Sequence, residues 1–214
     1  MTVNIQQNMM HIWVGPKPAP LKWMHTWRDK HPEWKYSVFD DQKLRNRSWR
    51  NQALIETYYN AQAYCGVSDL IRYELLYERG GFICEADMIC LENTDELWCA
   101  PEDHAYTCYE NEKGRGNNVQ PIFGCNPENP FVKFLLDELK RLKPQDLHHQ
   151  PFMSTGNAFL AKHVPQFRDK LTIWPSHYFI PQFYINGAQR YNGPDKIYAD
   201  HKWGSTGMGF NCVD

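Results

Sequence analysis

The stretch from Ser68 to Leu91 reads SDLIRYELLYERGGFICEADMICL and decides the fold class. Its first half predicts a helix over 68–79, which the following glycine pair ends. Its second half predicts a buried strand over 82–84, which continues over 88–91 after the triplet Glu85-Ala86-Asp87. A helix that leads directly into a buried strand is typical of α/β proteins.

Outward from this stretch, short apolar runs alternate with helical patterns. The expected strands are 9–14, 34–39, 105–109, 122–125, 171–174 and 196–199, and the expected helices are 21–30, 52–64, 130–143 and 157–163. The polar, glycine-bearing segment 111–118 is expected to form a mobile loop. At 214 residues the chain is predicted to form a single α/β domain over 1–214.

Composition limits the classes of function. Lys and Arg number 23 and Asp and Glu number 25, so the net charge is −2. This balance provides no general attraction to nucleic acid or to an anionic membrane, and a nucleic-acid partner is therefore a minority expectation. With 42% hydrophobic and 14% aromatic residues, the chain is not intrinsically disordered.

Cysteine usage and the N-terminal sequence indicate the compartment. The seven cysteines are odd in number and form no CxxC pair, which favours free thiols over a disulfide framework or a zinc site. The N-terminus has no basic and apolar regions typical of a secretory signal, and no segment approaches the length of a transmembrane span. We therefore expect a cytoplasmic protein with no transmembrane segment.

Four charged residues in the deciding stretch can carry chemistry. Asp69 and Arg72 lie three apart on the predicted helix and share a face. Glu85 and Asp87 lie two apart, so on an extended chain both carboxylates point the same way. Such carboxylates repel each other, whereas a divalent cation holds both, and oxygen ligands favour Mg²⁺, Mn²⁺ or Ca²⁺. An acidic triplet alone usually marks a solvated turn, but the buried strand before it favours a metal site.

These motifs resemble the DXD-motif sugar-transferase family (glycosyltransferase family thirty-two-like), with fungal initiating mannosyltransferases and bacterial capsular-polysaccharide transferases among its members. The resemblance rests on 68–97, SDLIRYELLYERGGFICEADMICLENTDEL, and on 11–41, HIWVGPKPAPLKWMHTWRDKHPEWKYSVFDD. The segments 154–157 (STGN) and 198–205 (YADHKWGS) are similar to later motifs of the family. A more distant similarity is to glucosylating toxin domains.

The resemblance implies a GT-A fold with a Rossmann-like mixed sheet flanked by helices. It implies a metal-dependent, retaining transfer of a hexose from a UDP- or GDP-sugar, with Mn²⁺ or Mg²⁺, to a hydroxyl acceptor such as a glycan. The catalytic residues it implies are Asp69, Arg72 and Asp87, and the metal ligands are Asp87, Glu85 and His201. The donor-binding residues it implies are Trp13, Val14, Gly15, Asp69, Arg72, Glu85, Ala86, Asp87, Trp203 and Ser205.

Two departures from the family pattern leave alternatives open. Glu85 replaces the first Asp of the motif, and Ser205 is not followed by the usual Trp. A nucleotide-sugar hydrolase on the same scaffold, or a binding module without activity, is therefore an alternative to the transferase. Trp13 stacks on the nucleotide base in the transferase interpretation, but a Trp at a strand end is also a common core residue.

Overall fold

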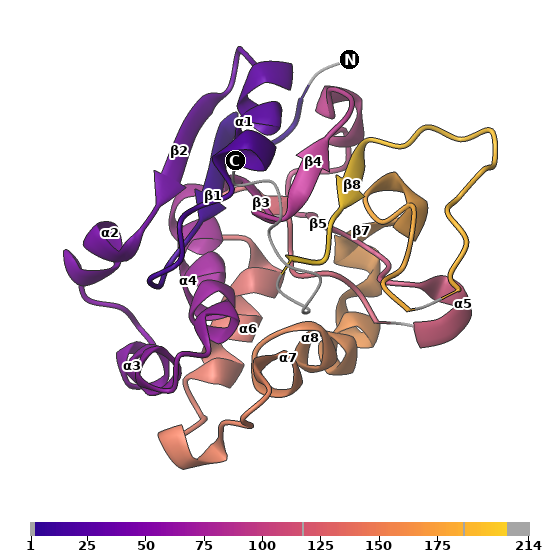
Figure 1. Cartoon of the computed structure of the whole chain (residues 1–214). Coiled ribbons are helices and arrows are strands. Elements are labelled where there is room, and N and C mark those ends of the chain that lie inside the picture. The colour runs from indigo at the N-terminus through magenta and orange to yellow at the C-terminus, as the bar shows by residue number, and fades with distance from the viewer. Residues whose placement is uncertain (1–2, 117, 186, 205–214) are drawn as a thin grey trace.

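A six-stranded mixed sheet forms the centre of the protein, seen in a computed structural model that describes residues 3–116, 118–185 and 187–204. The strand order is β2-β1-β3-β6-β5-β7 (Figure 1). β1 pairs in parallel with β2 and β3, β5 pairs in parallel with β7, and β6 is antiparallel to both its neighbours. The predicted α/β class is confirmed. The strands are β1 (Asn8–Ile12), β2 (Lys35–Phe39), β3 (Gly81–Cys84), β5 (Ala105–Cys108), β6 (Gly124–Cys125) and β7 (Leu171–Trp174).

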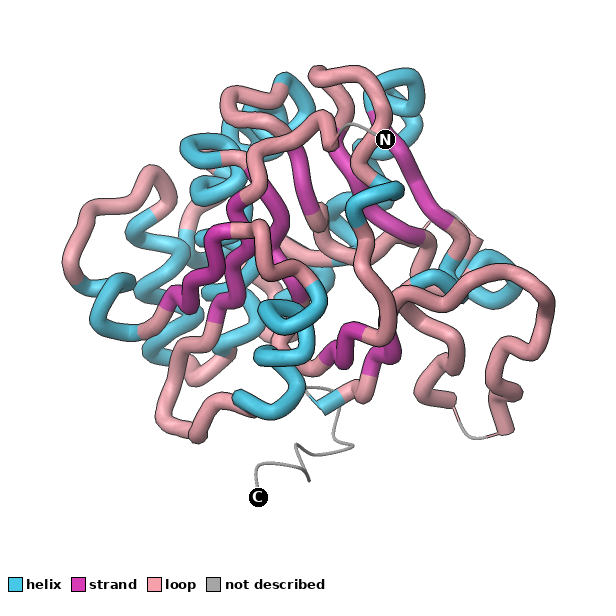
Figure 2. Tube along the Cα trace, turned by 90° about the horizontal axis from the view of Figure 1, so that it is seen from above, coloured by secondary structure: helices cyan, strands magenta, loops and turns pink. Residues whose placement is uncertain are grey.

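Helices cover both faces of the sheet (Figure 2). Side chains alternate along β1, so Met10 and Ile12 enter one core and Met9 enters the other. The Met10 side packs against α3 (Gln52–Asn60), α4 (Tyr64–Arg79), α6 (Pro130–Leu139) and α8 (Asn157–His163). The Met9 side packs against α1 (Leu21–Lys30) through Trp27, within a dense aromatic core. Both cores hold the strand ends in fixed positions.

A separate two-stranded sheet corrects one prediction. β4 (Met88–Cys90) does not continue β3 but pairs antiparallel with β8 (Ala199–His201) beside the large sheet, as Figure 1 shows. Met88 is paired with His201 in this ladder. The turn at Glu85 makes this possible, because the amide of Met88 donates to the Glu85 carbonyl (3.2 Å) and redirects the chain. Residues far apart in sequence therefore meet next to the acidic triplet.

Element boundaries differ from the predictions where tertiary contacts decide them. α4 begins at Tyr64 rather than at Ser68. Gly66 in its first turn packs closely against Tyr58 and Pro151, and a Cβ there would lie 2.5 Å from the Tyr58 ring. The segment 111–118, predicted as a loop, contains the short helix α5 (Glu112–Arg115). The remaining helical elements are α2 (Asp41–Arg45), α7 (Pro151–Ser154), η1 (Asp95–Leu97), η2 (Pro144–Asp146), η3 (Val164–Lys170) and η4 (Ser176–Tyr178).

Within residues 3–204, apart from positions 117 and 186, none of the helices is both long and apolar enough to cross a bilayer.

Candidate functional site

A cavity of about 490 Å³ opens where the parallel strands β1 and β3 end. In open α/β sheets, ligands bind outside the carboxyl ends of the strands, where loops carry polar groups past the sheet. The residues that line it come from three places, the end of β1, the start of α4 and the end of β3. They are Ile12, Trp13, Val14, Pro16, Lys17, Gln62, Ala63, Tyr64, Cys65, Ser68, Asp69, Arg72, Cys84, Glu85, Ala86 and Asp87.

Arg72, which is buried, and Glu85, which is partly exposed, form an ion pair in the cavity wall. The Arg72 side chain is 3% exposed, and one of its terminal nitrogens donates to a carboxylate oxygen of Glu85. The other donates to the carbonyls of Ile83 (2.9 Å) and Ile122 (3.2 Å), so the guanidinium ties α4 to the sheet. Burial raises the pKa of Glu85, an effect that Arg72 opposes. The ion pair with Arg72 thus fixes the position of the Glu85 carboxylate.

Asp69 lies beside this pair and is partly buried. Burial raises the pKa of Asp69 to about 7 from 3.8, the Arg72 charge opposes the rise, and the Glu85 charge adds to it. One carboxylate oxygen, Oδ2, accepts a hydrogen bond from the hydroxyl of Thr155 (3.1 Å). A carboxyl with this pKa changes its charge near neutral pH, which is a common feature of functional sites.

Asp87 and His201 meet across the β4–β8 sheet. His201 Nε2 lies 3.6 Å from Asp87 Oδ1, and both side chains are only 6% exposed. Antiparallel pairing of Met88 with His201 produces this contact, so the C-terminal histidine lies next to the acidic triplet. A carboxylate oxygen and an imidazole nitrogen are suitable ligands for Mn²⁺.

The residues that the structure describes do not form a metal site with three protein ligands. Among them, no three His, Cys, Asp or Glu side chains converge on one point. Glu85 and Asp87 do not share an extended strand, because the chain turns at Ala86, and Glu85 points to Arg72 instead. Two protein ligands still fit a cation of this class, since Mg²⁺ and related ions commonly keep waters and substrate phosphates as their other ligands.

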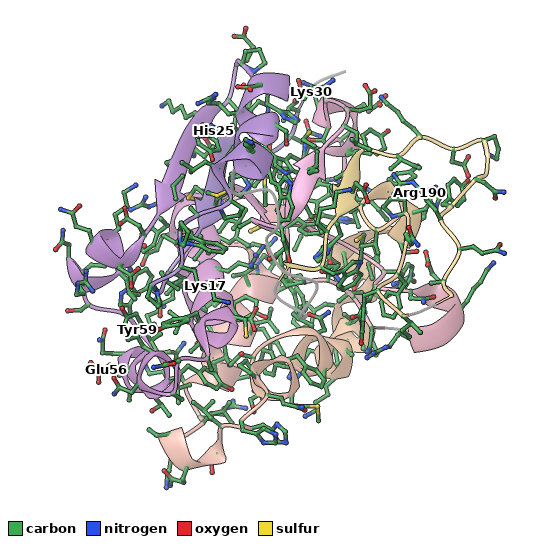
Figure 3. The ribbon with its side chains drawn as sticks, in the orientation of Figure 1. Lys17, His25, Lys30, Glu56, Tyr59 and Arg190 are labelled. Carbon is green, nitrogen blue, oxygen red and sulfur yellow. The ribbon has the colours of Figure 1, made fainter. Side chains whose placement is uncertain are left out.

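The loop after β1 is fixed by three contacts. Trp13 is partly exposed, and its Nε1 donates to the Lys17 carbonyl (2.7 Å), so the loop closes on itself. The Gly15 amide donates to Asp41 Oδ2 (2.9 Å), and Gly15 has a φ of +101°. A Cβ on Gly15 would lie 2.8 Å from the Tyr64 ring, so glycine is needed here for both reasons. Lys17 is labelled in Figure 3, near the centre of the view.

Trp203 and Ser205 are the two C-terminal residues predicted to bind the donor. Trp203 is 8% exposed, packs on His201 with ring centroids 4.1 Å apart, and donates from Nε1 to the Gln182 carbonyl (3.0 Å). It is not among the described residues that line the cavity, but it supports His201. Ser205 lies outside the described residues.

Sequence reasoning missed several residues of the cavity wall. Tyr64, Cys65 and Ser68 line the cavity next to Asp69 and Arg72. These positions follow the helical spacing of α4, where residues three and four apart share a face. The spacing could have revealed them, but a helix that begins at residue 68 excludes Tyr64 and Cys65.

The sequence comparisons agree with the resemblance. Residues 21–103 match the family described as "Glycosyltransferase sugar-binding region containing DXD motif". Inositol phosphoceramide mannosyltransferase 3 of Schizosaccharomyces pombe is 25% identical over 209 residues, which are 92% of this chain and 53% of that protein. Inositol phosphoceramide mannosyltransferase 2 of the same yeast is 26% identical over 114 residues, 53% of this chain and 31% of that protein. The chain thus spans about half the length of the first relative and less of the second.

Solved structures share the fold. PaToxG glycosyltransferase superposes with a TM-score of 0.62 at 17% identity, covering 76% of this chain and 69% of that one. The UDP-bound glycosyltransferase domain of the YGT toxin superposes with a TM-score of 0.54 at 10% identity, covering 79% of each chain. At these identities the similarity demonstrates a common fold, and the predicted GT-A fold is confirmed. Residues 21–103, which match the DXD-containing glycosyltransferase sugar-binding region, carry Asp69, Arg72, Glu85 and Asp87.

Proposed function

We propose that the protein is a metal-dependent, retaining glycosyltransferase that moves a hexose from a nucleoside-diphosphate sugar to a hydroxyl acceptor. The observation that carries the proposal is the cavity at the ends of β1 and β3, which gathers Trp13, Asp69, Glu85 and Asp87. Three of these four residues lie in the segment that matches a sugar-binding region. The cavity volume of about 490 Å³ suits a ligand of drug size or somewhat larger.

Different residues of the cavity wall suit different parts of the donor. Trp13 lines the cavity with a partly exposed aromatic ring, on which a nucleotide base can stack. Asp69 also lines the cavity, and its partly buried carboxylate can bind sugar hydroxyls and stabilise positive charge on the sugar. The YGT toxin domain, which shares this fold, is UDP-bound, and this supports a nucleotide as part of the ligand.

The diphosphate would lie next to Asp87 and His201. These two side chains would hold the cation, and a bound Mn²⁺ or Mg²⁺ would neutralise charge that develops on the leaving diphosphate. Glu85 stands beside them and is held by Arg72. The Glu for Asp change is therefore compatible with a site in which Asp87 is the main ligand.

The identities of the donor sugar and of the acceptor are part of the proposal. Both yeast relatives are named mannosyltransferases, so a mannosyl donor is the first to test. The acceptor is proposed to be a glycan or another hydroxyl-bearing molecule.

A thermal-shift screen of GDP-mannose, UDP-glucose and other nucleotide sugars, with and without Mn²⁺, tests donor binding. At one hundred times its dissociation constant a donor stabilises the fold by about 2.7 kcal/mol. For a chain of this size that is a rise in Tm of about 5–10 °C. Mass spectrometry of products formed with glycan acceptors then distinguishes transfer from hydrolysis, which releases free sugar.

The Asp87→Asn variant tests the metal site. We expect it to unfold cooperatively but to lose both transfer and the Tm rise that donor and Mn²⁺ produce together. Asp137→Asn is the matched control, because Asp137 is an exposed carboxylate on α6 paired with Lys133. Full transfer by Asp87→Asn would contradict the proposed site. Nucleotide binding that is independent of Mn²⁺, without turnover of any donor, would favour a binding module.

A further inference from the structure

Thr155 and Gly156 contact the carboxylate of Asp69 from a segment far along the chain. The two residues connect α7 to α8, and both are buried. The Thr155 hydroxyl lies 3.1 Å from Asp69 Oδ2 and 3.1 Å from the Pro151 carbonyl. Its single proton can serve only one of these acceptors at a time, and an ionised carboxylate is the stronger acceptor.

Gly156 lies next to the same carboxylate oxygen, and there is no room for a side chain at this position. A Cβ at this position would lie 2.9 Å from Asp69 Oδ2 and 3.0 Å from the Cα of Phe152. The φ of Gly156 is −104°, outside the left-handed region that favours glycine. The requirement is steric, because any side chain would displace either the carboxylate or α7.

A second bond holds the segment to the same face of α4. The Tyr73 hydroxyl donates to the Thr155 carbonyl (2.6 Å), and Tyr73 is fully buried. Tyr73 follows Asp69 by four residues, so both side chains project from one face of the helix. Thr155 is thereby anchored through its backbone while its hydroxyl reaches Asp69.

These contacts leave one carboxylate oxygen for a ligand. None of the residues in 3–204 that the structure describes donates a hydrogen bond to Asp69 Oδ1, whereas Oδ2 meets Thr155 and Gly156. Asp69 also lines the cavity. We propose that Thr155 and Gly156 are positioning residues that fix the rotamer of Asp69, so that Oδ1 meets a hydroxyl of the donor sugar. This inference rests on the proposed function, in which the cavity binds a nucleotide sugar.

Three variants separate positioning from general stability. Thr155→Val keeps the branched shape and removes the hydroxyl, Thr155→Ser keeps the hydroxyl, and Gly156→Ala pushes on the carboxylate. Thr107→Val is the matched control, because Thr107 is equally buried and its hydroxyl donates to the Gln120 carbonyl (2.8 Å) outside the cavity. Release of GDP from GDP-mannose, or of UDP from UDP-glucose, is measured with Mn²⁺, together with the affinity for free GDP and UDP.

We expect Thr155→Val to lower kcat/KM for the donor about tenfold, as the loss of one hydrogen bond predicts. Thr155→Ser should have a kcat/KM within about threefold of the wild-type value. Gly156→Ala should lose at least as much kcat/KM as Thr155→Val. Affinity for the free nucleotides should stay unchanged in all three. Wild-type kcat/KM in Thr155→Val, or an equal loss in Thr107→Val, would overturn the inference.

A crystal structure of each variant tests the inference without turnover. The Asp69 carboxylate should keep its place in Thr155→Ser and leave it in Thr155→Val and Gly156→Ala. If the wild-type protein turns over no nucleotide sugar, the proposed function fails, and an unmoved Asp69 in these structures overturns the positioning role separately.

Discussion

Replacing Asp69 by Asn should stabilise the free protein, and by more at alkaline than at acidic pH. The ordinary pKa of this carboxyl is 3.8, and burial raises it to about 7 in the folded protein. Between these values the folded state keeps a proton that the unfolded chain has released. The free energy of unfolding therefore falls as the pH rises through this window, by about 1.4 kcal/mol for each pH unit. Asn has the same shape and cannot ionise, so the free energy of unfolding of the variant does not fall for this reason as the pH rises.

The size of the effect follows from the two pKa values. At pH 5 the cost of the raised pKa is about 1.6 kcal/mol, and above pH 7 it approaches about 4 kcal/mol. The gain in stability of Asp69→Asn over the wild type should thus be larger at pH 8 than at pH 5 by up to about 3 kcal/mol. Partial exposure of Asp69 makes this an upper value.

Urea unfolding at pH 5 and pH 8, in the presence of EDTA, measures this difference directly. Asp137→Asn serves as the control, because an exposed carboxyl whose pKa is lowered by Lys133 is ionised at both pH values. If Asp69→Asn raised the free energy of unfolding by the same amount at pH 5 and at pH 8, this would refute the reasoning that burial raises the pKa of Asp69. The same variant should lose donor turnover, since the gain in stability comes from removing a functional charge.

Three further predictions concern residues in or near the cavity. Trp13→Ala should weaken binding of GDP and UDP by about 1–3 kcal/mol, the usual value for stacking on a base, and a large fall in Tm with normal nucleotide binding would instead make Trp13 a core residue. His201→Ala should weaken the Mn²⁺-dependent part of donor binding by about 10- to 100-fold while binding in EDTA is unchanged, as isothermal titration can measure. Asp41→Ala removes the acceptor of both the Gly15 amide (2.9 Å) and the Tyr59 hydroxyl (2.6 Å), so KM for the donor should rise about tenfold with little change in kcat; an unchanged KM would show that the loop needs no such support.

Local patterns were sufficient to predict several individual elements. The predicted helix over 21–30 and the predicted strand over 171–174 coincide with α1 and β7. The run of apolar residues before Glu85, and the placement of Asp69 and Arg72 on one helix face, depend only on neighbouring residues. Helical and strand periodicity are local properties, so they can be read from a single sequence. The same is true of the family resemblance, which uses contiguous motifs.

Contacts between distant segments could not be predicted in this way. The turn at Ala86 sends β4 to pair with β8, and only this pairing brings His201 within 3.6 Å of Asp87. The ion pair of Arg72 with Glu85 joins a helix to a strand end. No local rule separates a carboxylate that binds a cation from one that neutralises a buried arginine, since both require a charged side chain beside a buried strand.

The sequence by itself determined the α/β class, the order of most elements and the identity of the acidic residues, because each follows from short-range periodicity or a contiguous motif. Only the tertiary structure decided which carboxylate meets Arg72, which meets His201, and that Thr155 reaches Asp69 from 86 residues away. These pairings depend on the burial of two separate cores on either side of the sheet. Burial of this kind is a property of the whole chain, and it sets both the distances and the pKa of Asp69.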